Sequence, residues 1–200
     1  MYDSSFGAIA ARMWWLLHWL GHKAVAVLDG DLRKWEKERR PLTTELAHIT
    51  PTQFHPAIRE ELWVDSEAVA RMVADKAGLI IDARSEERFN GEREPFDAVA
   101  GHIPGAINVP FEDNLEMGGT FLSREELGGH YRTLLGGRHP HEVVHMCGSG
   151  VTACHSLLAM EHAGLRGARL YVGSWSEWIR DPQRPIATGA GRMPGKAMVL

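Results

Sequence analysis

The chain has 200 residues, a length typical of one domain with an additional segment. Apolar residues make up 44% of it and charged residues 24%, as in ordinary globular proteins. The formal net charge is -4 and no basic stripe stands out, which argues against nucleic-acid binding. Cys147 and Cys154 are too few for a disulfide framework and lack zinc-site spacing. They fit a reducing compartment, so we expect a cytoplasmic protein.

The amino-terminal segment has some features of a secretory leader. The apolar run ARMWWLLHWL at 11–20 is followed by AVA at 24–26, the pattern of a signal peptide and its cleavage site. However, the residues before the run include Asp3 and no Lys or Arg. The run is also well short of the ~20 apolar residues that span a bilayer. We therefore expect no membrane segment, and an internal repeat explains the run better.

The sequence repeats itself when it is shifted by 143 residues. Both copies predict a helix, a glycine, a short apolar strand, a second glycine and a turn that ends in tryptophan. Glycine at such turns supplies the positive φ that other residues avoid. The alternative explanation is chance combined with shared amphipathicity. Five identities coincide without a gap: Gly7 with Gly150, Ala10 with Ala153, Gly21 with Gly164, Gly30 with Gly173 and Trp35 with Trp178.

The two copies differ in chemistry and in completeness. Ser4 takes the place of Cys147, so the first copy carries no thiol. The second copy also has a strong upstream block, LIIDARSEERF at 79–89 and GHIPGAINVPF at 101–111, whose counterparts would precede Met1. We therefore expect the last third of one domain joined to one complete domain, as in a chain truncated at its amino terminus.

This organisation predicts an unstable amino-terminal segment. The helix of the first copy would lack its sheet partners and leave apolar surface exposed. We expect such a surface to self-associate or to stay mobile. Three tryptophans carry most of it: Trp14, Trp15 and Trp19.

The rest of the chain alternates predicted helices and strands. Asp65 is expected to cap a helix that Gly78 ends, and Ser123 with Glu126 predicts a capping box for a helix at 124–135. Strands that alternate with helices predict an α/β fold, an open, mostly parallel sheet with helices on both faces. Four short apolar runs predict strands, at 79–82, 107–109, 142–146 and 168–172.

Cys147 follows the predicted strand at 142–146 and precedes a helix expected from about Gly150. Open α/β sheets bind ligands at this carboxyl edge. The loop GSGVT can turn several backbone N–H groups inward, and these groups favour a thiolate together with the helix dipole. The position therefore favours a nucleophile over an inert buried cysteine. Cys154, deeper in the helix, is interpreted as a core residue.

Four motifs occur in order: DARSEERFNGE, GHIPGAINVP, CGSGVTAC and LYVGSWSEW. With them the chain resembles the rhodanese superfamily, and more closely the carboxyl-terminal catalytic domain of tandem-domain 3-mercaptopyruvate and thiosulfate sulfurtransferases. The first copy resembles the tail of the family's inactive amino-terminal domain. The resemblance implies a non-catalytic segment at 1–45, a linker at 46–62, a catalytic rhodanese domain at 63–190 and a tail at 191–200.

In this family the loop cysteine takes a sulfane sulfur from a small anionic donor, holds it as a persulfide and passes it to cyanide or a thiol. The resemblance implies that Cys147 is the nucleophile and that Arg88 holds a carboxylate or sulfonate of the donor. It implies no metal or other cofactor, and a thioredoxin-like protein as a further acceptor. Asp82 and Arg84 match a pair that should brace the strand end. Five loop residues would bind the sulfur and the donor: Gly148, Ser149, Gly150, Val151 and Thr152.

The chain also departs from its relatives. Asp97 stands where the mercaptopyruvate enzymes carry a second arginine. Gly148 and Ser149 are neutral where thiosulfate-specific relatives are basic, so we expect 3-mercaptopyruvate to be preferred over thiosulfate. Ala153 stands where phosphatases of this fold need an arginine, which disfavours that activity. The alternative to an enzyme is a weak or inactive fragment that acts as a persulfide carrier or a protein-binding module.

Overall fold

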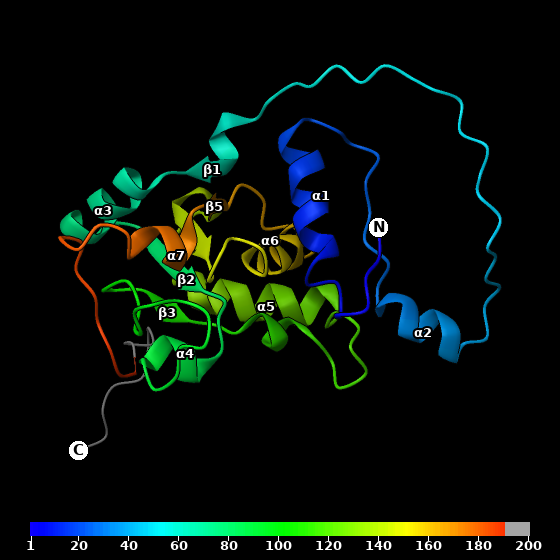
Figure 1. Cartoon of the computed structure of the whole chain (residues 1–200). Helices are drawn as coiled ribbons and strands as arrows, with labels where there is room; N and C mark the ends of the chain where they lie inside the picture. The colour runs from blue at the N-terminus through cyan, green and yellow to red at the C-terminus, as the bar shows by residue number, and fades with distance from the viewer. Residues whose placement is uncertain (191–200) are drawn as a thin grey trace.

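A computed structural model describes residues 1–190, and its second half contains the predicted parallel sheet (Figure 1). Five strands lie in the order β1-β5-β4-β2-β3, and every neighbouring pair is parallel. The α/β prediction is therefore confirmed, although β1 is too short to be recognised from its sequence. The strands are β1 (Trp63–Val64), β2 (Leu79–Asp82), β3 (Ile107–Asn108), β4 (Val143–Met146) and β5 (Arg169–Tyr171).

Helices cover both faces of the sheet (Figure 1). The second half has α3 (Ser66–Asp75), α4 (Glu86–Asn90), α5 (Arg124–Leu135), α6 (Ala153–His162) and α7 (Ser174–Trp178). Successive strand residues point to opposite faces. Ile81 and Val143 therefore pack with α5 and α6, whereas Ile80 and Val144 pack with α3 and α7. Short 3₁₀ helices lie at Glu60–Leu62, Phe111–Asn114 and Pro140–Glu142.

The predicted helix boundaries are mostly correct. Asp65 caps α3 by accepting a hydrogen bond from the N–H of Ala68 at 2.8 Å. The capping box predicted for α5 is present. The prediction that Gly78 ends α3 is wrong, because Lys76 already adopts a left-handed conformation with φ 51°. A lysine tolerates this conformation at some cost, so the glycine two residues later was a misleading signal.

The internal repeat is confirmed by the backbone. Helix α1 (Ala10–Trp19) and α6 coincide residue for residue under the shift of 143 residues. The loops before them bend at Gly7 (φ 83°) and Gly150 (φ 73°). Helix α2 (Asp31–Lys37) begins at the position equivalent to the start of α7. The two copies therefore share local geometry as well as sequence.

The first copy lacks the short strand predicted after its helix, in the apolar stretch at 24–28. The Met1 ammonium group donates to the carbonyl oxygen of Ala26 at 2.7 Å, and the N–H of Leu28 donates to the carbonyl oxygen of Met1 at 2.8 Å. Residues 22–28 have no strand partner within residues 1–190. The stretch at 24–28 is therefore irregular, and the prediction of a strand there is wrong.

The tryptophan-rich helix is covered by a helix of the second copy. Helix α1 packs against α6, and Trp14 and Trp15 are 7% and 4% exposed. Trp19 is half-buried and stacks on Trp15, with ring centroids 6.1 Å apart. The expectation that these side chains remain uncovered is therefore wrong for Trp14 and Trp15. These tryptophans are covered by the apolar core of the second copy, although the first copy has no sheet of its own within residues 1–190.

Residues 41–59 form an irregular connection that runs around the outside of the molecule (Figure 1). Two backbone bonds at its end attach it to α1, from the N–H of Ala57 to the carbonyl oxygen of Leu20 and from Arg59 to Trp19, both at 2.9 Å. The predicted tail at 191–200 lies outside the described residues. Among residues 1–190, every helix is too short or too polar to cross a membrane.

An aspartate closes the loop of the first copy. Asp3 Oδ1 accepts hydrogen bonds from the N–H groups of Ser5 (2.8 Å) and Gly7 (2.9 Å). Its Oδ2 accepts from Ile9 (2.9 Å) and Ala10 (2.7 Å). Burial raises the pKa of Asp3, but the four donors outweigh burial and hold the pKa below its usual value. The carboxylate therefore fills a ring of backbone donors at the start of α1.

Replacing Asp3 with Ala should destabilise the protein by about 2 kcal/mol, because four backbone N–H groups lose their acceptor. A lowered folded pKa stabilises above the unfolded pKa of about 3.9 and is lost as the pH falls through the folded value. The Tm difference from the wild type should therefore be constant between about pH 7 and pH 5 and should shrink below about pH 4. Asp75→Ala, an exposed change, is the control and should leave Tm nearly unchanged. Equal effects of the two changes would contradict the role of Asp3.

Candidate active site

Cys147 lies at the carboxyl end of β4 and is fixed there by the first turn of α7. Its N–H donates to Ser174 Oγ at 3.2 Å, and its carbonyl oxygen accepts from the N–H of Trp175 at 3.1 Å. The residue is 2% exposed and lines a cavity of about 270 Å³. The cysteine is therefore held by its backbone while it borders the cavity.

The cavity brings together residues that are far apart in the sequence. Its walls come from the loop after β4, from α4 and the segment that follows it, and from α7. Six of the seven predicted site residues line it: Cys147, Arg88, Gly148, Ser149, Val151 and Thr152. The other lining residues are Phe96, Asp97 and Ser176.

Gly150, the seventh predicted residue, shapes the loop from behind. A Cβ atom there would lie 2.5 Å from the carbonyl oxygen of Val172, and φ is 73°, so only glycine fits. A Cβ atom at Gly148 would lie 3.2 Å from Arg88 Nη2. The helix expected from about Gly150 begins instead at Ala153, because residues 148–152 form this loop.

The loop presents a row of free backbone donors. The N–H groups of residues 148–153 donate to no acceptor within residues 1–190. Four of these positions correspond, under the shift of 143 residues, to those that hold the Asp3 carboxylate in the first copy. Met146 occupies the position of Asp3 and supplies no acceptor. The loop can therefore hold an anion beside Cys147.

Arg88 reaches the cavity with its charge already paired. Its Nη2 donates to Glu94 Oε1 at 2.8 Å and lies 3.4 Å from Asp97 Oδ2. Asp97 also accepts a hydrogen bond from Ser176 Oγ at 2.7 Å. The arginine that the family resemblance predicts as donor-binding therefore lines the same cavity as Cys147, and Asp97 lies beside it as a counter-charge.

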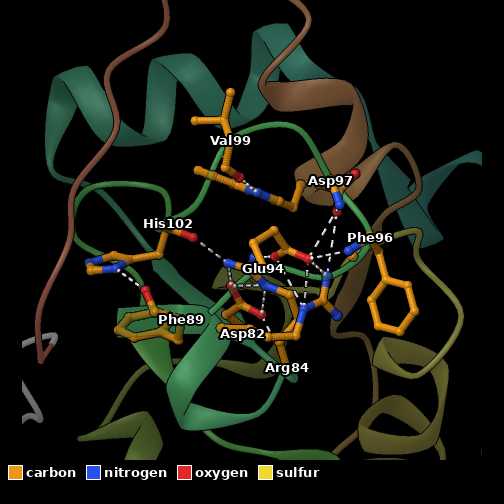
Figure 2. A network of polar contacts seen from close by, with 12 residues as sticks. Asp82, Arg84, Phe89, Glu94, Phe96, Asp97, Val99 and His102 are labelled. Carbon is orange, nitrogen blue, oxygen red and sulfur yellow. Dashed lines mark hydrogen bonds and ion pairs between the residues drawn. The ribbon is translucent and has the colours of Figure 1, made fainter. Parts of the chain in front are cut away.

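A buried ion network connects Arg88 to the sheet through Glu94 and Arg84. Figure 2 shows Asp82, Arg84 and Glu94 of this network. Arg84 Nη2 donates to Asp82 Oδ2 and to the carbonyl oxygen of Gly101, both at 2.7 Å, and its Nη1 donates to Glu94 at 3.2 Å. Burial raises the pKa of Glu94, but bonds from Arg88 and two backbone N–H groups outweigh burial and keep the pKa below its usual value. Asp82 and Arg84 brace the strand end as expected, and Glu94 links them to the site.

Four residues of the site were not predicted, among them Phe96, which lines the cavity. Glu94 orients Arg88, Ser174 anchors the backbone of Cys147, and Ser176 bonds to Asp97 and to the carbonyl oxygen of Gly148. The serines lie in the LYVGSWSEW motif, which carried the family resemblance but suggested no role for them. Nothing in the order of residues indicated which arginine Glu94 would contact.

Cys154 is a core residue of α6, as interpreted from its position. It is fully buried, and its Sγ donates to the carbonyl oxygen of Gly150 at 3.2 Å. Burial raises the pKa of Cys154 to about 12. Its thiol therefore stays protonated at neutral pH and takes no part as a nucleophile.

Iodoacetamide at about pH 8 should modify Cys147 and spare Cys154, because only Cys147 borders the cavity and Cys154 remains a thiol. Peptide mapping by mass spectrometry identifies the modified residue. The unfolded chain in guanidinium chloride is the control, in which both cysteines should react. Modification of Cys154 in the folded protein would contradict this assignment.

Residues 65–181 match the family model of the rhodanese-like domain. The chain therefore belongs to the rhodanese-like family, as its motifs predicted. A Pseudomonas aeruginosa protein named "Probable 3-mercaptopyruvate sulfurtransferase" is 47% identical over 190 residues, which cover 94% of this chain and 67% of that protein. Human 3-mercaptopyruvate sulfurtransferase is 34% identical over 207 residues, which cover 96% and 66%. Rat thiosulfate sulfurtransferase is 35% identical over 186 residues, which cover 90% and 62%.

The chain thus spans about two thirds of the length of these relatives. Among solved structures, it is similar to an anaerobic ergothioneine biosynthesis enzyme from Chlorobium limicola, with a TM-score of 0.78 and 24% identity. The match covers 90% of this chain and 45% of that enzyme, and at this identity it shows the fold alone.

Proposed function

We propose that this chain is a sulfurtransferase that moves a sulfane sulfur through a persulfide on Cys147. The observation that carries the proposal is the open row of N–H groups at residues 148–153 beside a cysteine that lines a cavity. Residues 63–190 would form the catalytic domain, with residues 1–45 as a non-catalytic copy. The relatives named as sulfurtransferases support this reading.

The first half-reaction loads the cysteine. The Cys147 thiolate attacks the sulfur of 3-mercaptopyruvate, a sulfur–sulfur bond forms, and the carbon–sulfur bond of the donor breaks. The electron pair of that bond passes to the carbon, which takes up a proton, so pyruvate leaves. Arg88 holds the carboxylate of the donor, and the loop N–H groups stabilise the charge on the terminal sulfur of the persulfide.

The second half-reaction restores the thiolate. Cyanide or a thiolate attacks the outer sulfur, and the sulfur–sulfur bond breaks toward Cys147. The products are thiocyanate or a new persulfide, and no metal or other cofactor enters the balance. We include a thioredoxin-like protein among the thiol acceptors and place the reaction in the cytoplasm, where free cysteines persist.

Incubation with 3-mercaptopyruvate should add the mass of one sulfur to Cys147, and cyanide should remove it as thiocyanate. Intact mass and peptide mapping measure the change, and Cys147→Ser should stay unmodified. Cys154→Ser is the matched control and should still be loaded. More than one thiocyanate per chain separates an enzyme from a persulfide carrier. Sulfur that maps to Cys154, or that persists in Cys147→Ser, would overturn the proposal.

The charges of the cavity support 3-mercaptopyruvate over thiosulfate as donor. Arg88 and Asp97 are the charged residues that line the cavity, and their charges oppose each other. Thiosulfate is a dianion and would be favoured by two cations, but within residues 1–190 Arg88 is the single cation that lines the cavity. 3-Mercaptopyruvate carries one carboxylate, which one cation can pair. A basic side chain at Gly148 would point at the Arg88 guanidinium, which lies 3.2 Å from the Cβ position. The uncharged residues Gly148 and Ser149 therefore add no positive charge to a cavity in which Asp97 already offsets Arg88.

Comparison of kcat/KM should show a preference of the wild type for 3-mercaptopyruvate. Asp97→Asn should raise kcat/KM by about tenfold for thiosulfate and about threefold for 3-mercaptopyruvate, because removing one negative charge favours a dianion by twice the free energy. Glu92→Gln, an exposed change in the same segment, is the control and should leave the ratio unchanged. A wild type that prefers thiosulfate, or an unchanged ratio in Asp97→Asn, would contradict the charge argument.

A further inference from the structure

The two copies of the repeat exchange one contact each across the interface between α1 and α6. Arg12, the third residue of α1, donates from Nη1 to the carbonyl oxygen of Gly150 at 3.2 Å. His155, the third residue of α6, is its equivalent under the shift of 143 residues, and its Nε2 hydrogen-bonds to the carbonyl oxygen of Phe6 at 3.2 Å. Each helix therefore contacts the loop of the other copy.

The Gly150 carbonyl oxygen is held by two side chains. Cys154 Sγ lies 3.2 Å from it, and Arg12 Nη1 lies 3.8 Å from the same sulfur. The Arg12 guanidinium also lies over the ring of Trp15, 5.1 Å from its centroid. A cation stacked on a buried tryptophan is restricted in position, so it fixes the carbonyl toward α1.

The orientation of one carbonyl determines that of the next N–H. In a planar trans peptide the C=O and the N–H of the following residue point in opposite directions. Because the Gly150 oxygen is held toward α1, the N–H of Val151 points away from α1. This fixes the peptide plane between Gly150 and Val151, and with it the bend of the loop between the N–H groups of Gly150 and Thr152, two of the positions whose equivalents hold Asp3 in the first copy.

We propose that Arg12 is a positioning residue that sets the conformation of the loop after Cys147, so that its free N–H groups face the transferred sulfur. The proposal rests on the sulfur transfer proposed above and goes beyond it. It gives the first copy a part in the reaction, although that copy carries no nucleophile. The bond of His155 to the carbonyl oxygen of Phe6 supports a loop whose N–H groups Asp3 already occupies, so that bond has no reaction to serve.

The test replaces Arg12 with Met, which keeps an apolar chain over Trp15 and removes the donor and the charge. We expect kcat for thiocyanate formation to fall about tenfold, the effect of one charge-assisted hydrogen bond. KM for 3-mercaptopyruvate should stay within about twofold, because Arg88 is untouched. Arg12→Lys, which restores a donor and a charge, should recover part of kcat.

A second measurement needs no sulfur transfer. The rate at which iodoacetamide modifies Cys147 should fall about threefold in Arg12→Met, because the misoriented loop stabilises the thiolate less. A wild type that forms no persulfide, but whose alkylation rate depends on Arg12, would refute the proposed function and leave the positioning role intact.

His155→Phe is the matched control. Phenylalanine keeps the stacking on Phe121, whose ring centroid is 4.4 Å away, and loses the bonds to Phe6 and to Asn114. We expect it to lower Tm about as much as Arg12→Met does and to leave kcat and the alkylation rate unchanged. Equal losses of kcat in the two variants would reduce Arg12 to a general interface residue. An Arg12→Met protein with normal kcat and normal alkylation would overturn the proposal.

Discussion

The parallel pairing of β2 with β4 is the constraint on which the site depends. Their register places Asp82 beside Met146, so both strands end at the same edge of the sheet. The segment after β2 then delivers Arg88, and the segment after β4 delivers Cys147. A slip of one residue would turn each side chain to the other face and separate the guanidinium from the thiol.

Buried charges beneath the cavity surround Arg88. Arg84 and Arg88 share Glu94, and Asp97 adds a further carboxylate beside Arg88. Such a network is costly to break, since removal of one partner leaves an uncompensated charge in a buried place. The overall net charge of -4 says little about this cavity, which is lined by one cationic and one anionic side chain, Arg88 and Asp97.

The two loops show how one backbone serves two purposes. In the first copy, Asp3 fills the ring of N–H groups at the start of α1, and the loop is complete in itself. In the second copy, Met146 takes that position, and the corresponding donors beside Cys147 meet no acceptor within residues 1–190. The difference between a structural loop and a reactive one is therefore a single acceptor, together with the thiol.

The sequence by itself determined the longer helices, the main strands, the repeat and the position of Cys147, because periodicity, caps and glycine turns act within a few residues. It placed Arg88 in the site only through the resemblance to a family. Only the tertiary structure showed that Glu94 and Asp97 neutralise that arginine. It also showed that α1 packs against α6. The contact of Arg12 with Gly150 joins residues 138 positions apart. No local pattern encodes such a contact, because it exists only once two helices have packed together.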